Sequence, residues 1–149
     1  MRSIVLAAVL FLPVFLRAES PAPYLVNKKA VATTGAKDQA TLHEGTSAIV
    51  VTAQAPVPAE ITDKSLAQSV AKEAAIGIGR THLMRYVLKK KTHTKKTLAD
   101  AMIPSVDLQK SVKDLVDGAE VKNVEWKTDQ CVVTLSLSKD KLAKILRGA

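Results

Sequence analysis

The feature that most constrains the fold is a long helical pattern between two stretches of strand-like sequence. From Lys64 to about Lys91, apolar residues recur at helical spacing and define one broad face. The residues of this face are Leu66, Val70, Ala74, Ile78, Leu83, Met84, Val87 and Leu88. Ala67, Ala71 and Ala75 form an adjacent stripe of small residues, whose spacing of four lets a helix lie close to a sheet or a second helix. We therefore predict one long helix that packs on a sheet.

Three segments have the composition of β-strands. Residues 47–55, SAIVVTAQA, are rich in β-branched side chains, and the prolines that follow would end a strand here. Residues 130–138, QCVVTLSLS, alternate so that Cys131 and the apolar residues at 133, 135 and 137 face one way. Residues 119–128, AEVKNVEWKT, place Val121 on the opposite parity to Val124 and Trp126, and a bulge near 122–123 would bring all three to the core. The last two segments predict a hairpin with a turn near 128–129.

Helix signals fill the remainder of this region. Thr62 or Asp63 can cap the long helix, residues 97–102 can form a helical turn, and Ser105 can cap a helix that Gly118 ends. Ser138 can cap a last helix, KDKLAKILR. We predict a single α+β domain over 47–149, with a three-stranded, mainly antiparallel sheet packed on one long helix in the order β-α-α-β-β-α. A sheet this small is marginal alone, so we expect self-association.

The N-terminal region has the layout of an export signal. Residues 1–18, MRSIVLAAVLFLPVFLRA, combine Arg2, an apolar run from Ile4 to Leu16 and Ala18 before an acidic residue. The run is short for a bilayer span, so cleavage is expected, although retention as an anchor is the alternative. No cysteine follows the run, which excludes lipidation there. Residues 19–46 lack any sustained period and predict a poorly ordered leader or linker, so we expect an exported, periplasmic bacterial protein.

The sequence holds no pattern typical of a catalytic or metal-binding site. His43, His82 and His93 lie in separate segments, without the spacing that places two imidazoles on one metal ion. There is no G-x-S-x-G elbow, although a spatial triad needs no motif, and the acidic residues are scattered. We predict no metal, no cofactor and no enzymatic activity, with an enzyme of unrecognised site as the alternative.

Two further features have simple structural explanations. The glycines of IGIGR, residues 76–80, lie inside a helical pattern, whereas phosphate-binding glycines follow a strand and open a helix. We interpret them as sites of close backbone packing or a mild kink. Cys131 is the only cysteine and lies mid-strand on the apolar side, so we expect a buried, inert thiol.

Residues 88–98, LKKKTHTKKTL, concentrate the positive charge of a chain whose formal net charge is +8. The candidate binding residues are Lys89, Lys90, Lys91, Lys95 and Lys96. Lysines at the end of a helix are favoured by its dipole, so a solvated loop explains part of the pattern. Attraction to an anionic lipid headgroup, an envelope polymer or an acidic partner is the functional alternative. We expect no nucleic-acid binding, because an export signal removes that partner and Tyr86 is the only aromatic residue nearby.

The order of elements resembles the LPP-twenty lipoprotein family and the similar N-terminal domain of the flagellar assembly protein T. The matching residues, within about 47–138, are Ala67, Ala71, Ala75, Gly118, Ala119, Val121, Trp126, Val132 and Val133. The resemblance implies a non-enzymatic α+β domain of the bacterial envelope that acts through assembly or surface association, and it supplies no catalytic residues. The lipoproteins carry a lipidated cysteine that is absent here, which separates this chain from outer-membrane anchoring.

Together these observations predict a non-enzymatic exported envelope protein that acts as a structural or assembly module. Self-association or an envelope protein partner is expected. The alternative is a binding module that captures an anionic polymer, lipid headgroup or acidic partner with the five lysines of residues 89–96.

Overall fold

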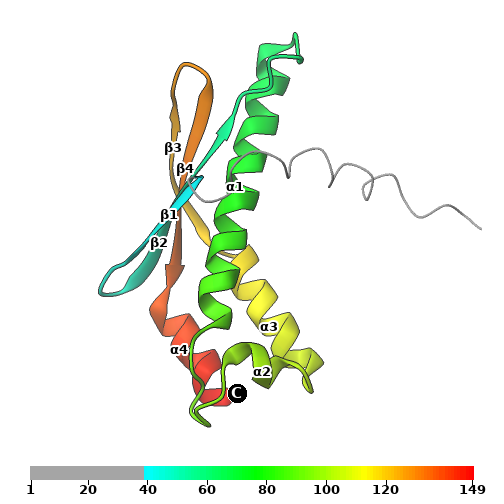
Figure 1. The fold of residues 1–149 in the computed structure, drawn as a ribbon. Helices are drawn as coiled ribbons and strands as arrows, with labels where there is room; N and C mark the ends of the chain where they lie inside the picture. The colour runs from blue at the N-terminus through cyan, green and yellow to red at the C-terminus, as the bar shows by residue number, and fades with distance from the viewer. Residues whose placement is uncertain (1–38) are drawn as a thin grey trace, which may run out of the picture. The chain divides into compact units, whose positions relative to one another are not determined.

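The computed structural model describes residues 39–149, which form an α+β unit (Figure 1). The elements in chain order are β1 (Ala40–Glu44), β2 (Ala48–Pro56), α1 (Lys64–Leu88), α2 (Leu98–Met102), α3 (Val106–Asp117), β3 (Glu120–Trp126), β4 (Gln130–Ser138) and α4 (Lys139–Gly148). The predicted signal peptide 1–18 and the predicted leader as far as residue 38 lie outside the described residues.

The sheet confirms the predicted fold class but has one more strand than expected. Its order is β1-β2-β4-β3, and all neighbouring strands are antiparallel. The additional strand, β1, falls within residues 19–46, where we expected a leader, and Leu42 lies opposite Val51 of β2. The prediction of three strands was wrong because β1 is a short edge strand. Four of its five residues are exposed, so it lacks the alternation that marks a half-buried strand.

Helix α1 lies along one face of the sheet over β2 and β4 (Figure 1). Its N-cap is Asp63, whose carboxylate accepts hydrogen bonds from the backbone N–H groups of Ser65 (2.9 Å) and Leu66 (3.2 Å). The helix ends at Leu88, with Lys89 as its C-cap, slightly before the predicted end near Lys91.

The side of α1 that meets the sheet combines the stripe of small residues with Leu83 and Val87, two members of the broad apolar face. The buried residues are Ala67, Ala71, Ala75, Ile76, Gly79, Leu83 and Val87, whereas Leu66 is 55% exposed and Val70 is also exposed. Leu66 and Val70, from the broad apolar face, therefore lie away from the sheet, whereas the alanines of the small-residue stripe take the close position that their spacing indicated. Close approach explains the choice: a Cβ added at Gly79 would lie only 2.7 Å from Leu135 Cδ1, so this glycine serves close packing, as predicted.

The two strands of the predicted hairpin differ in burial. In β4 the residues Cys131, Val133, Leu135 and Leu137 are buried, as the alternation predicted. The bulge in β3 is confirmed by a register shift between Val121 and Asn123. Our expectation that it would bury Val121 and Trp126 was wrong, since both remain exposed. Strand β3 is the outer strand beside β4, so its side chains are covered from one side only.

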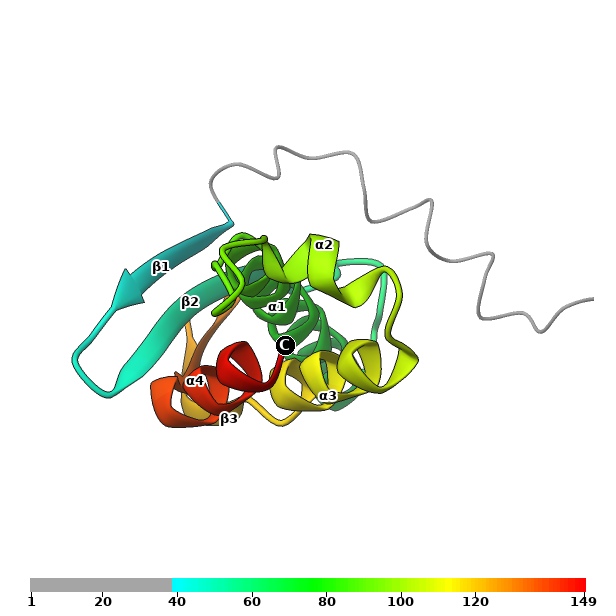
Figure 2. The ribbon, with the colours of Figure 1, turned by 90° about the horizontal axis from the view of Figure 1, so that it is seen from below.

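The three shorter helices gather at one end of the sheet (Figures 1 and 2). The predicted caps are confirmed, with Ser105 and Ser138 as the N-caps of α3 and α4 and Gly118 as the C-cap of α3; the predicted helical turn at 97–102 is α2, and its N-cap is Thr97. Buried side chains from each of these helices extend the core that α1 shares with the sheet; they include Leu98, Val112, Val116 and Leu142. The helices surround the end of α1, which places the candidate site.

Candidate functional site

The lysine-rich segment that joins α1 to α2, residues 89–96, is an ordered turn that we call the basic connector. Lys91 forms an isolated bridge with Thr97, and the backbone N–H of Leu98 donates to the carbonyl of Lys90 at 2.8 Å. Thr92 is buried, and its N–H donates to the carbonyl of Lys96 at 2.9 Å. Lys95 takes the left-handed conformation with φ of 64°. The connector is therefore held in a defined geometry.

The start of α2 fixes the far end of the basic connector. Thr97 and Asp100 form a capping box, in which the Thr97 side chain accepts from the N–H of Asp100 and the Asp100 carboxylate accepts from the Thr97 N–H. The Thr97 hydroxyl, with smaller contributions from Lys91 and Lys96, lowers the pKa of Asp100. Asp100 is therefore a carboxylate that faces the positive charge of the connector.

The structure separates the five candidate lysines into two groups. Lys89, Lys91, Lys95 and Lys96 are exposed and form no ion pair with any residue of the range 39–149. Lys90 instead turns toward the sheet, with its Nζ 3.3 Å from the Glu44 carboxylate and 4.2 Å from the centre of the Tyr86 ring. Four of the predicted residues therefore share an exposed surface, and the fifth belongs to a different cluster.

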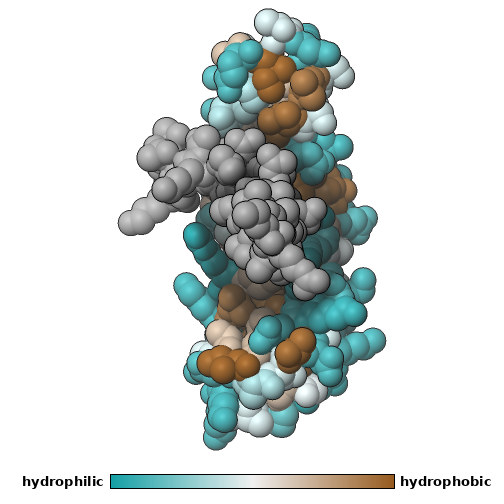
Figure 3. Space-filling view, turned by 90° about the vertical axis from the view of Figure 1, so that its right-hand side faces the viewer, coloured by the Kyte–Doolittle hydropathy of each residue, from teal (hydrophilic) through white to brown (hydrophobic). Residues whose placement is uncertain are grey.

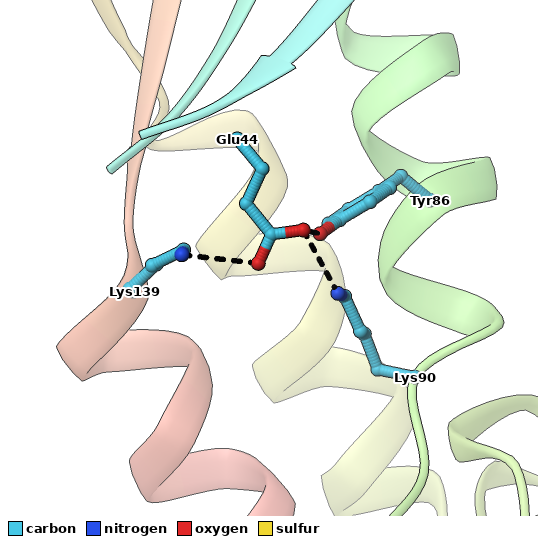
Figure 4. Close-up of polar contacts among 4 residues, drawn as sticks. All are labelled: Glu44, Tyr86, Lys90 and Lys139. Carbon is cyan, nitrogen blue, oxygen red and sulfur yellow. Dashed lines mark hydrogen bonds and ion pairs between the residues drawn. The ribbon is translucent and has the colours of Figure 1, made fainter. Parts of the chain in front are cut away.

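That cluster is centred on Glu44, the last residue of β1 (Figure 4). Its carboxylate accepts a hydrogen bond from the Tyr86 hydroxyl of α1 and pairs with Lys90 and with Lys139 (3.0 Å), the first residue of α4. These partners, Tyr86 foremost, lower the pKa of Glu44 from 4.5 to about 2. Tyr86 and Glu44 in turn raise the pKa of Lys90.

The Glu44 cluster has a structural role. A general base works best when its pKa lies near the operating pH, and a carboxyl group with a pKa near 2 is far from that range. Its three partners come from α1, the basic connector and α4. The cluster therefore fastens the edge strand β1 to the helices.

A groove of about 650 Å³ opens between α1, α2 and α3. The wall on the α1 side is made by Arg80, Thr81, Met84 and Arg85. Arg80 and Met84 are four residues apart, as are Thr81 and Arg85, so all four lie on one face of the helix. The other lining residues come from α2, its C-cap and α3, and are Ala99, Met102, Ile103, Gln109, Lys113, Val116 and Asp117. We call this surface the helical groove. Its volume falls within the range typical of ligand sites, roughly 300–1,000 Å³.

Large apolar side chains lie exposed in the helical groove and near it in the chain. Ile103, which lines it, is 78% exposed, and Val106 at the start of α3 is 77% exposed. Figure 3 shows hydrophobic side chains among hydrophilic ones at the level of α2 and the beginning of α3, and a separate hydrophobic group at the N-terminal end of α1. Exposed apolar residues that border a groove are typical of interaction surfaces.

The polar groups of the helical groove are mainly cationic. Lys113 pairs with Asp117 at 2.5 Å, which raises the pKa of Lys113 and lowers that of Asp117. Arg80 donates from Nη2 to the backbone carbonyl of Asp117 at 2.7 Å. Arg85 is exposed. The lining thus contains three cations and one carboxylate around an apolar floor.

The remaining sequence candidates do not converge on a chemical site. Within residues 39–149, no group of three histidine, cysteine, aspartate or glutamate residues could hold a metal ion. His43 is in β1, His82 in α1 and His93 in the basic connector. Cys131 is fully buried, as predicted, and burial raises the pKa of its thiol. Among the helices of this same range, none has the length and apolarity to span a membrane.

The helical groove and the Glu44 cluster were both missed by the sequence-based predictions. A signal for the groove was present, because Ile103 precedes a proline and Val106 lies off the stripe of Leu108, Val112 and Leu115. The Glu44 cluster joins residues more than 40 positions apart, and no local pattern could have indicated it.

In comparisons with known proteins, no family model, no curated protein and no solved structure matches the chain.

Proposed function

We propose that this protein is a non-enzymatic, exported envelope protein that acts as an assembly module and binds a partner protein through the helical groove. The observation that carries the proposal is the exposure of Ile103 in an apolar groove of about 650 Å³, with Val106 exposed three residues further along the chain. Two large aliphatic side chains that stay in water do not stabilise the fold, whereas a partner that covers them would remove their apolar surface from water and gain binding free energy.

Co-purification of the full chain from its native envelope tests this proposal. The double variant Ile103→Asp/Val106→Asp should lose a partner that the unmodified protein retains. The matched control is Leu66→Asp/Val70→Asp, which places the same charges on exposed apolar residues of α1 that do not line the groove. Equal retention of the partner by both double variants would contradict binding through the helical groove.

A second candidate function is association with an anionic surface through the basic connector. It is supported by the four exposed lysines, Lys89, Lys91, Lys95 and Lys96, and by their position beside α4. The N–H of His93 donates to the carbonyl of Leu146 at 3.2 Å, which brings the exposed Lys144 and Arg147 close to the connector. Each lysine near an anionic membrane surface contributes about 1 kcal/mol to the attraction.

Vesicle sedimentation separates this second function from the first. Replacing the four exposed lysines by Ser should abolish salt-sensitive binding to vesicles that contain an anionic lipid, because most of the attracting charge is removed. The single variant Lys90→Ser should change this binding little, since Glu44 already pairs with Lys90. Unchanged sedimentation of the four-lysine variant would end the idea.

A further inference from the structure

The helical groove combines an apolar floor with cations on two facing walls. Arg80 and Arg85 lie on α1, and Lys113 lies on α3. Figure 2 shows α2 and α3 beside α1, and residues of all three helices line the groove, so its arginines and its lysine lie on different helices. Apolar side chains from all three helices, among them Met84 and Met102, lie between these charges. A ligand of the groove would therefore contact apolar and cationic groups together.

The hydrogen bonding of Arg80 indicates which chemistry the groove would accept. A guanidinium group has five N–H donors, and one nitrogen of Arg80 donates to the Asp117 carbonyl. Its Nε is buried and has no hydrogen-bond partner among residues 39–149. Because Nε is closed to solvent, a ligand that enters the groove would meet the other N–H donors of this guanidinium group. Carboxylates suit this geometry, because they accept two hydrogen bonds from one guanidinium group.

The only carboxylate of the groove lining does not neutralise the three cations. Asp117 pairs with Lys113, and both side chains are exposed, so this pair is weak and can exchange for another carboxylate. Arg85 is exposed at the same opening and has no ion pair within the described range. The groove therefore keeps an excess of positive charge for a ligand.

We propose that the helical groove binds an acidic amphipathic segment of a partner protein. Apolar side chains of that segment would cover Met84, Met102 and Ile103, and its carboxylates would pair with Arg80, Arg85 and Lys113. This inference rests on the proposed function and adds the chemistry of the partner to it. Binding of an amphipathic helix in an apolar groove flanked by charge is a recurring mode of peptide recognition.

Two other occupants fit the groove less well. A second copy that packs groove to groove is disfavoured, because Arg80, Arg85 and Lys113 of one copy would face the same cations of the other. A lipid surface is flat, whereas the cations Arg80 and Lys113 line a concave opening. The acidic protein segment satisfies the apolar floor and the cationic walls at once.

Peptide binding to the full chain tests the inference. The probes are two peptides of about 15 residues with leucines at helical spacing, one with Glu and one with Lys at the flanking positions. In fluorescence anisotropy at low salt, the acidic peptide should bind on the order of tenfold more tightly than the basic one, and salt should weaken its binding. Equal binding of both peptides, or binding of neither, would overturn the inference.

Charge-reversal variants locate the effect. Arg85→Glu/Lys113→Glu should remove the preference for the acidic peptide, whereas the matched control Lys72→Glu/Lys127→Glu, with the same change in net charge away from the groove, should retain it. If the double reversal instead abolished sedimentation with anionic vesicles and left peptide binding intact, the cations would serve a lipid surface and the inference would be wrong.

The fate of the co-purified partner distinguishes this inference from the proposed function. If the partner is lost from Ile103→Asp/Val106→Asp but its retention is insensitive to salt and to Arg85→Glu/Lys113→Glu, the groove binds a partner without acidic recognition. That outcome overturns the inference and leaves the proposed function standing. Retention by all of these variants would overturn both.

Discussion

The two apolar sides of α1 differ in how completely the fold covers them. Toward the sheet, Leu83 and Val87 are fully buried and Gly79 allows the helix backbone to approach Leu135. Toward α2 and α3, Met84 lies in an open groove beside the exposed Ile103. The sheet side is closed by the chain itself and stabilises the fold, whereas the groove side presents apolar surface that the fold does not use. This difference leads us to assign stability to one side and binding to the other.

The largest expected effect comes from neighbouring truncations on the two sides. Leu83→Ala should lower the free energy of unfolding by about 2–5 kcal/mol, because it leaves a cavity beneath the sheet. Met84→Ala, one residue later on the groove side, should cost clearly less, since Met84 is half-buried. Chemical denaturation of both variants measures the difference. Equal losses would mean that the groove side is as much a part of the core as the sheet side.

The Glu44 cluster offers a comparison that depends on pH. The pKa of Glu44 is lowered in the folded protein from 4.5 to about 2. Its contribution to stability is therefore complete above about pH 4.5 and is lost as the pH falls toward 2. Glu44→Gln should be less stable than the unmodified protein at neutral pH, and the gap should shrink over that range. A gap that is independent of pH in denaturation curves would exclude the ion pairs as its source.

A smaller effect is expected in the basic connector, where Lys95 has φ of 64°. Lys95→Gly should raise the free energy of unfolding by about 0.5 kcal/mol. Glycine removes the steric cost that a side chain has in the left-handed conformation, and this gain exceeds the larger conformational entropy that glycine loses on folding. Lys96→Gly, one residue later and without positive φ, should lower it slightly. Thermal unfolding of the two variants distinguishes a fixed turn from a loose loop. In a loose loop, the two substitutions would change the stability by the same amount.

The smallest expected effect is that of a charge at the groove. Ile103→Asp should change the free energy of unfolding by less than about 0.5 kcal/mol, because the side chain is 78% exposed. Chemical denaturation of Ile103→Asp and Leu83→Ala, measured together, tests whether the groove side contributes less to stability than the sheet side. A loss as large as that of the core variant would show that Ile103 supports the fold.

Sequence reasoning predicted the elements whose signals are local. The caps at Asp63, Ser105 and Ser138 and the alternation of β4 depend on neighbouring residues, and the structure confirms each of them. The face of α1 could not be chosen in this way, because both a stripe of alanines and a stripe of larger residues have helical spacing. The sheet side took the alanines together with Leu83 and Val87, because the helix must approach the sheet closely at Gly79.

The candidate site was less accessible to prediction than the fold. The lysines of the basic connector are visible in the sequence, but the separation of Lys90 from the other four depends on Glu44, whose strand gave no recognisable pattern. The helical groove depends on how three helices pack, and the exposure of Ile103 is a property of that packing. Local periodicity describes what a helix can bury and says little about what its neighbours leave uncovered.

The most direct test of the central claim is site-specific photo-crosslinking of the full chain in its native envelope. A photoreactive residue at position 103, in the helical groove, should form a discrete adduct with a partner protein. The same residue at position 121, which is exposed on the outer strand β3, should form none. An adduct at 121 together with no adduct at 103 would contradict the assignment of binding to the helical groove.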